Sequence, residues 1–114
     1  MKRNKTKRKK IYLASPYTHS IKHIVNERVE AAREYVSRHT PEWNIFSPIV
    51  YSDCLLLGDT GTDWKTWWKY NKREIDACDE LHVLMLPGWE HSEGVRIEIE
   101  YANENNILTI YKRK

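Results

Sequence analysis

Four short apolar runs bounded by turn residues are the clearest pattern in the chain, and they predict buried strands. They cover residues 10–14, 44–49, 81–86 and 107–111. The first run ends at the turn Ser15-Pro16-Tyr17, and Pro48 is expected to cut the second strand short, because proline cannot donate a ladder hydrogen bond. The third run is largely apolar throughout, which is typical of a parallel strand covered on both faces.

Helical periodicity fills the intervals between these runs. It predicts helices over 21–38, over 64–78 with Asp63 as the N-cap, and after Ser92, which is also a good N-cap. Residues 52–63 form a loop long enough to act as a lid. The alternation predicts an α/β fold, a flavodoxin-like or Rossmann-like three-layer sandwich. Its mostly parallel sheet is expected to have about four to five strands in the order 2-1-3-4.

In such sheets the ligand lies outside the carboxyl ends of the strands, at the point where the strand order reverses. For the order 2-1-3-4, this point lies between the first and third strands. The turn after the first strand and the loop at 87–92 would then face each other across one cleft. We therefore expect Tyr12, Ser92 and Glu98 to lie near one another.

Glu98 is the main candidate for chemistry in this cleft. On a helix, Val95, Ile99 and Ala102 form one buried stripe, and Glu98 lies roughly 40 to 60° to its side, half withdrawn from water. Gly94 leaves the first helical turn open, so that an anion or a sugar can approach the N–H groups at the positive end of the helix dipole. Spacing alone favours a plainer interpretation, in which Glu98 is a solvated helix charge near an ordinary i,i+4 ion pair.

Charge is distributed unevenly along the 114 residues, a length that suits one domain. Residues 2–10 hold seven of the 19 basic residues and no acid. The remaining 12 basic and 16 acidic residues give that part a formal charge of −4, against +3 for the whole chain. We predict a solvated, disordered tail over 1–10 ahead of a domain over 11–114, with nonspecific nucleic-acid contact as a further role of the tail. The apolar run after it is too short for a secretory signal, and no stretch is long enough to span a membrane.

Cysteine and histidine usage argues against a metal site. Cys54 and Cys78 lack metal-type spacing and are too few to cross-link a domain, so we expect reduced thiols in the cytoplasm. His19 and His23 have i,i+4 spacing, but no third ligand completes the set. The sequence also lacks a phosphate-binding loop, a dinucleotide fingerprint and a serine hydrolase motif, so we expect no metal and no organic cofactor.

Aromatic residues flank the predicted cleft. Trp64, Trp67 and Trp68 have helical spacing, which favours packing, although indole faces can also stack on a nucleobase. Trp89 in the 87–92 loop is the better candidate for ligand contact. His91 in the same loop could be a titratable partner for a phosphate or a base, but a surface histidine is the plainer interpretation.

Five short motifs follow the basic segment in a fixed order. They are Ile11-Tyr12-Leu13-Ala14-Ser15-Pro16-Tyr17, Phe46-Ser47-Pro48-Ile49, Cys78-Asp79-Glu80-Leu81, Leu86-Pro87-Gly88-Trp89 and Ser92-x-Gly94-Val95-x-x-Glu98-x-x-x-Ala102. By these motifs the chain resembles the nucleoside 2-deoxyribosyltransferase superfamily, which includes 2'-deoxynucleoside 5'-phosphate N-hydrolases, and most closely its DUF1937 branch. The likeness covers nearly everything after the basic segment.

The resemblance implies that Glu98 attacks the anomeric carbon of a deoxyribosyl unit, expelling the base and leaving a glycosyl ester that water or a second base resolves. A carboxylate suits this role, because it stabilises an oxocarbenium-like transition state and needs no prior deprotonation at neutral pH. In the family, the tyrosine matching Tyr12 hydrogen-bonds this carboxylate, and the serine and glycine matching Ser92 and Gly94 hold a substrate phosphate. Tyr12 as a core residue and Ser92 as a plain N-cap are the alternatives. Further motif residues expected to bind substrate are Ser15, Pro16, Ser47 and Pro48.

One position departs from the family pattern. Family members usually have an aspartate eight residues before the residue matching Asp79, where it positions or protonates the leaving base, and this chain has Asn71 there. An amide can hydrogen-bond a base but cannot supply a proton. The resemblance implies a homodimer or higher homo-oligomer that cleaves or exchanges the N-glycosidic bond of a nucleoside or nucleoside monophosphate. Asn71 and the basic segment motivate the alternative, a catalytically inactive module that binds nucleotides or nucleic acid.

Overall fold

A computed structural model describes residues 8–54 and 64–114, and a single parallel sheet organises this part of the chain. Its strands are β1 (Lys9–Ala14), β2 (Trp43–Phe46), β3 (Glu80–Leu84) and β4 (Leu108–Lys112). They pair in the order β2-β1-β3-β4, and all three pairings are parallel. The predicted α/β fold and strand order are confirmed.

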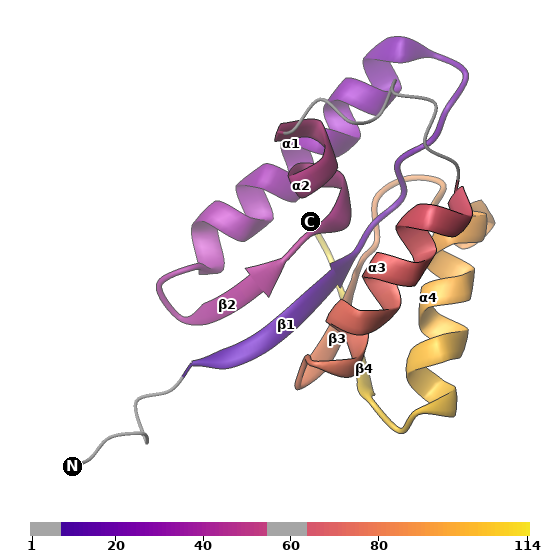
Figure 1. The fold of residues 1–114 in the computed structure, drawn as a ribbon. Helices are drawn as coiled ribbons and strands as arrows, with labels where there is room; N and C mark the ends of the chain where they lie inside the picture. Colours follow the sequence, from indigo (N-terminus) through magenta and orange to yellow (C-terminus); the bar gives the residue numbers. More distant parts are fainter. Residues whose placement is uncertain (1–7, 55–63) are drawn as a thin grey trace.

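Helices cover both faces of the sheet (Figure 1). They are α1 (Lys22–His39), α2 (Pro48–Cys54), α3 (Trp64–Asp76), the short 3₁₀ helix η2 (Trp89–His91) and α4 (Glu93–Glu104). Because successive strand residues point to opposite faces, Leu13 of β1 packs in the cluster under α1 and α2. Its neighbour Tyr12 packs in the cluster under α3 and α4. Every residue of β3 is buried, as expected for a central parallel strand.

The second strand is shorter than predicted. β2 ends at Phe46, and Pro48 begins the helix α2 instead of closing a strand. Ser47 explains the difference, because its Oγ accepts the N–H of Val50 at 3.3 Å and its carbonyl accepts the N–H of Tyr51 at 3.0 Å. Ser47 is thus an N-cap, and proline suits the first helical position because its missing N–H needs no partner there.

Two other predicted segments, the basic tail and the lid, have boundaries that differ from those in the structure. β1 begins at Lys9, so the last two residues of the basic segment belong to the sheet, whereas residues 1–7 lie outside the described residues. The predicted lid over 52–63 overlaps the end of α2, and residues 55–63, with the predicted cap Asp63, also lie outside. None of the helices within the described ranges is long and apolar enough to cross a bilayer.

A buried polar chain joins β3 to α1. Glu80 Oε1 lies 2.9 Å from His82 Nε2, and the Tyr35 hydroxyl lies 2.9 Å from His82 Nδ1. A neutral imidazole satisfies both contacts, with Nε2–H donating to the carboxylate and Nδ1 accepting from the phenol. Burial holds the pKa of His82 below its usual value, which favours this neutral form. Glu80, His82 and Tyr35 therefore satisfy one another's hydrogen bonds and stabilise the contact between β3 and α1.

Candidate active site

Glu98 of α4 meets Tyr12 of β1 inside the protein. The Tyr12 hydroxyl donates a hydrogen bond to Glu98 Oε2 at 2.6 Å, the short distance typical of a charge-assisted bond. Tyr12 is fully buried and Glu98 is 9% exposed. The interpretation of Glu98 as a solvated helix charge is therefore wrong, although the i,i+4 pair Arg96–Glu100 exists, with 2.9 Å between Nη1 and Oε2. Tyr12 is both a core residue and the partner of this carboxylate.

Burial controls the ionisation of this pair. It raises the pKa of Glu98 to about 7, and the hydrogen bond from Tyr12 opposes that shift. Burial, followed by the neighbouring charge of Glu98, raises the pKa of Tyr12 well above its usual value, so the phenol remains the donor. With a pKa of about 7, Glu98 is only partly ionised at neutral pH in the ligand-free site, because burial withdraws water from the carboxylate.

A cavity of about 470 Å³ opens beside Glu98 at the carboxyl edge of the sheet. This volume lies within the range of small-molecule sites. The turn after β1, the start of α2, the middle of α3 and the start of α4 all contribute to its wall. Besides Glu98, the predicted site residues in its lining are Ser15, Pro48, Asn71, His91, Ser92 and Gly94.

Two polar atoms in this wall lack a partner. Among the described side chains, the buried atoms without a hydrogen bond are Ser15 Oγ and Asn71 Oδ1, and both residues line the cavity. Leaving a buried polar atom unsatisfied costs about 1–3 kcal/mol, so such atoms call for a ligand or an ordered water. Ser15 is only 8% exposed, so its side chain is held in the protein wall of the cavity. The cavity is thus prepared for a polar ligand.

A smaller chamber of about 100 Å³ adjoins Glu98 on the side of α3. Trp67, Trp68, Asn71 and Gly94 line it together with Glu98. Trp68 also packs on the core and lies edge-on to Tyr101, with 5.6 Å between ring centroids, which confirms packing for this residue. The chamber therefore places indole surface and an amide on one side of the carboxylate. The side chain of Trp64 lies outside the described part.

The remaining predicted residues have structural roles. Ser92 is the N-cap of α4, since its Oγ accepts the N–H of Val95 at 3.3 Å, and it lines the cavity as well. Ser47 is the buried cap of α2, and Pro16 is fully buried within the turn after β1. Trp89 packs on the core and on Tyr111, with 5.7 Å between ring centroids, and the described cavity lining does not include it.

Arg28 lies next to the site, and helical periodicity alone does not distinguish it from the apolar residues of the same helix face. It occupies a position that the helical repeat over 21–38 assigns to the buried face, and it is 9% exposed. Its Nη1 donates to the carbonyl of Thr18 at 2.9 Å, and Thr18 lines the cavity. A charged residue at a buried helical position was the available signal.

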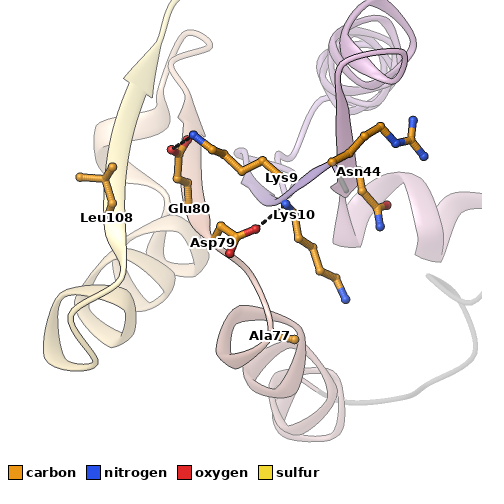
Figure 2. Close-up of a pocket in the computed structure, with 8 residues that line it drawn as sticks. Lys9, Lys10, Asn44, Ala77, Asp79, Glu80 and Leu108 are labelled. Atoms are coloured by element: carbon orange, nitrogen blue, oxygen red, sulfur yellow. Dashed lines mark hydrogen bonds and ion pairs between the residues drawn. The ribbon is translucent and has the colours of Figure 1, made fainter. Parts of the chain in front are cut away.

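A second cleft, of about 670 Å³, lies at the opposite, amino edge of the sheet (Figure 2). Arg8, Lys9 and Lys10 contribute to it, but Lys9 Nζ pairs with Glu80 Oε2 at 2.8 Å. Asp79 there accepts the backbone N–H of Lys10 at 2.7 Å. Nucleic-acid contact by the basic segment stays a prediction. In the described ranges, no group of three or more His, Cys, Asp or Glu side chains is placed to hold a metal ion.

Comparison with known proteins places this architecture in a family. No curated protein matches the sequence. Residues 9–112 match the family described as "Domain of unknown function (DUF1937)". This match spans the whole sheet together with Tyr12, Asn71 and Glu98. The chain therefore belongs to the DUF1937 family.

Proposed function

We propose that this protein cleaves or exchanges the N-glycosidic bond of a deoxynucleoside or its 5'-monophosphate, with Glu98 as the nucleophile. The observation that carries the proposal is a buried carboxylate that opens onto a polar cavity and is held by one phenol at 2.6 Å. No described Lys, Arg or His side chain forms an ion pair with Glu98. Its negative charge is thus available to a carbon that develops positive charge.

The reaction needs two displacements at the anomeric carbon. Tyr12 binds Oε2 of Glu98, which leaves Oε1 to form the bond to carbon while the carbon–nitrogen bond breaks and its electron pair leaves with the base. Water or a second base then attacks the same carbon and releases the carboxylate. The first acceptor gives hydrolysis and the second gives transfer. Neither displacement requires a metal or an organic cofactor.

The two ends of the cavity suit the two ends of such a substrate. On the side of α3, the indoles of Trp67 and Trp68 offer apolar surface to a base, and the Asn71 amide offers it a hydrogen bond. On the other side, Ser92 lies at the positive end of the α4 dipole, where a 5'-phosphate is stabilised, and Gly94 lines both spaces between the two ends. The resemblance to the nucleoside 2-deoxyribosyltransferase superfamily supports the same orientation and an oligomeric assembly.

Base release is the direct test. The full-length protein is incubated with each of the common 2'-deoxynucleosides and their 5'-monophosphates, and free base is measured by liquid chromatography. Intact-mass analysis, followed by peptide mapping, would locate a deoxyribosyl ester on Glu98. Thermal stabilisation by these compounds with no release of base would instead support the inactive nucleotide-binding module that Asn71 motivates.

Tyr12→Phe is expected to move the acidic limb of the pH–rate profile to higher pH. In the native protein, kcat/KM should rise with pH through about 7, as Glu98 ionises in the free enzyme. Removing the phenol removes the hydrogen bond that favours the charged form, so the pKa of Glu98 should rise further. The profile of kcat/KM against pH checks this. An unmoved limb, or a rate that falls with pH near 7, would contradict the nucleophile assignment.

Asn71→Asp is expected to increase base release about 10-fold or more, because a carboxylic acid in the chamber can protonate the departing base whereas an amide cannot. The variant should also gain a basic limb in its pH–rate profile, since only the protonated acid helps the base to leave. Steady-state rates for native protein and variant decide this. A rate that does not increase at any pH would show that the base departs without acid assistance from this position.

A further inference from the structure

Arg28 is a buried cation without an acidic partner. It lies on α1 and is 9% exposed, and no described Asp or Glu forms an ion pair with it. Two backbone carbonyls accept its hydrogen bonds, Thr18 from Nη1 at 2.9 Å and Pro87 from Nη2 at 3.0 Å. Withdrawing a guanidinium from water is unfavourable unless its contacts compensate. The hydrogen bonds to these two carbonyls therefore compensate for burying the guanidinium.

The two carbonyls belong to the two loops that face each other across the cavity. Thr18 follows the turn after β1 and lines the cavity with Ser15. Pro87 follows β3 and opens the loop that leads to Ser92, the cap of α4. One rigid, planar group on α1 thus bridges both walls, with a separate nitrogen for each.

Gly88 gives independent support for this bridge. Its φ of +90° is a left-handed conformation that side chains disfavour. A Cβ built at this position would also lie 2.8 Å from Arg28 Nη2. The loop after β3 therefore approaches the guanidinium as closely as it does because the residue is glycine.

We propose that Arg28 is a positioning residue, which fixes the separation of the β1–α1 turn and the loop before α4 and thereby the width of the substrate cavity. The inference rests on the proposed function only for the identity of the ligand that the cavity binds. The bridge that Arg28 makes between the two loops does not depend on that function. Tyr12 and Glu98 are held by β1 and α4, so the bridge should control substrate binding and leave the ionisation of Glu98 unchanged.

Arg28→Lys in the full-length chain tests the proposal, because a single ammonium cannot replace two separate nitrogens. Amide hydrogen exchange should accelerate together in peptides covering 15–21 and 86–92. KM for a 2'-deoxynucleoside 5'-monophosphate should rise about 10-fold, since small misplacements of binding groups weaken productive binding. The acidic limb near pH 7 should stay in place. Arg38→Lys, an exposed arginine on the same helix, is the matched control and should change none of these.

Gly88→Ala should reproduce the result from the other side of the contact, and it replaces the lysine variant if that variant does not fold. Faster exchange in only one loop, or an unchanged KM in a folded variant, would overturn the proposal, because a merely structural arginine lowers the melting temperature without changing KM. If the native protein releases no base, the proposed function fails. Hydrogen exchange, and the dissociation constant for the same monophosphate, then decide on the bridge separately.

Discussion

Glu98→Gln should abolish base release while the protein still folds and still binds its substrate. The amide keeps the shape of the side chain, and its carbonyl oxygen can accept the hydrogen bond from Tyr12 that Oε2 accepts in the native protein. It cannot form the glycosyl ester, and it cannot balance the positive charge at the anomeric carbon. We expect kcat/KM to fall by roughly 10³-fold or more, as measured by release of free base.

Glu100→Gln is the matched control for this loss. Glu100 lies on the same helix but is exposed and paired with Arg96, with 2.9 Å between the charged atoms. Its replacement should leave the rate of base release close to that of the native protein. If Glu98→Gln kept a substantial rate, or if the ester mapped to another residue, Glu98 would not be the nucleophile.

Glu98→Gln should also stabilise the folded protein at alkaline pH. The pKa of Glu98 in the folded protein is about 7, against an ordinary value of 4.5. Between these values the folded state binds more protons than the unfolded state, so the native protein loses stability as pH rises through this window. The loss is complete at about pH 8, roughly one unit above the folded pKa, and amounts to about 3 kcal/mol for such a shift. Glutamine has no charge to bury and escapes this loss.

Melting curves of native protein and variant across pH would measure this difference. We expect the two melting temperatures to lie close together near pH 4.5 and to separate by roughly 10 °C at pH 8, with the variant higher. All other titrating groups are shared, so their contributions cancel in the difference. Glu100→Gln should show no such separation, because that carboxylate is exposed. Melting temperatures that stay together at pH 8 would mean that Glu98 ionises as easily as a surface glutamate.

These two results would together describe a site that is kept at the expense of stability. A buried carboxylate with a raised pKa destabilises the ligand-free protein at neutral and alkaline pH, and two buried polar atoms of the same cavity have no protein partner. A substrate that bonds to Ser15 and Asn71 would satisfy both atoms on binding. These groups together mark the place where a ligand would act.

The fold could be predicted from the sequence because its signals are local. Apolar runs at 10–14 and 81–86, separated by helical periodicity, predict a parallel sheet, and the expected order 2-1-3-4 is the order that the structure has. The order then brings the end of β1 and the start of α4 to one edge, and Tyr12 and Glu98 meet there. The start of α2 is also signalled in the sequence, since Ser47-Pro48 is typical of a helix start, but the same proline is equally typical of a strand that ends there.

Other features of the site depend on atoms that are distant in the sequence. The pKa of Glu98 is set by how completely β1 and α4 exclude water, and no spacing along one helix specifies that. The unpartnered atoms of Ser15 and Asn71 become visible only when every neighbouring donor and acceptor has a position. The bridge from Arg28 to Thr18 and Pro87 spans 10 and 59 positions of the chain.

Local patterns in the sequence predict the sheet and the cap at Ser92, and with the expected strand order they also predict that Tyr12 lies near Glu98. The burial of the carboxylate, and the arginine of α1 that joins the two walls of its cavity, appear only in the folded arrangement. Desolvation and hydrogen-bond geometry are properties of assembled surroundings, to which several separate segments contribute at once.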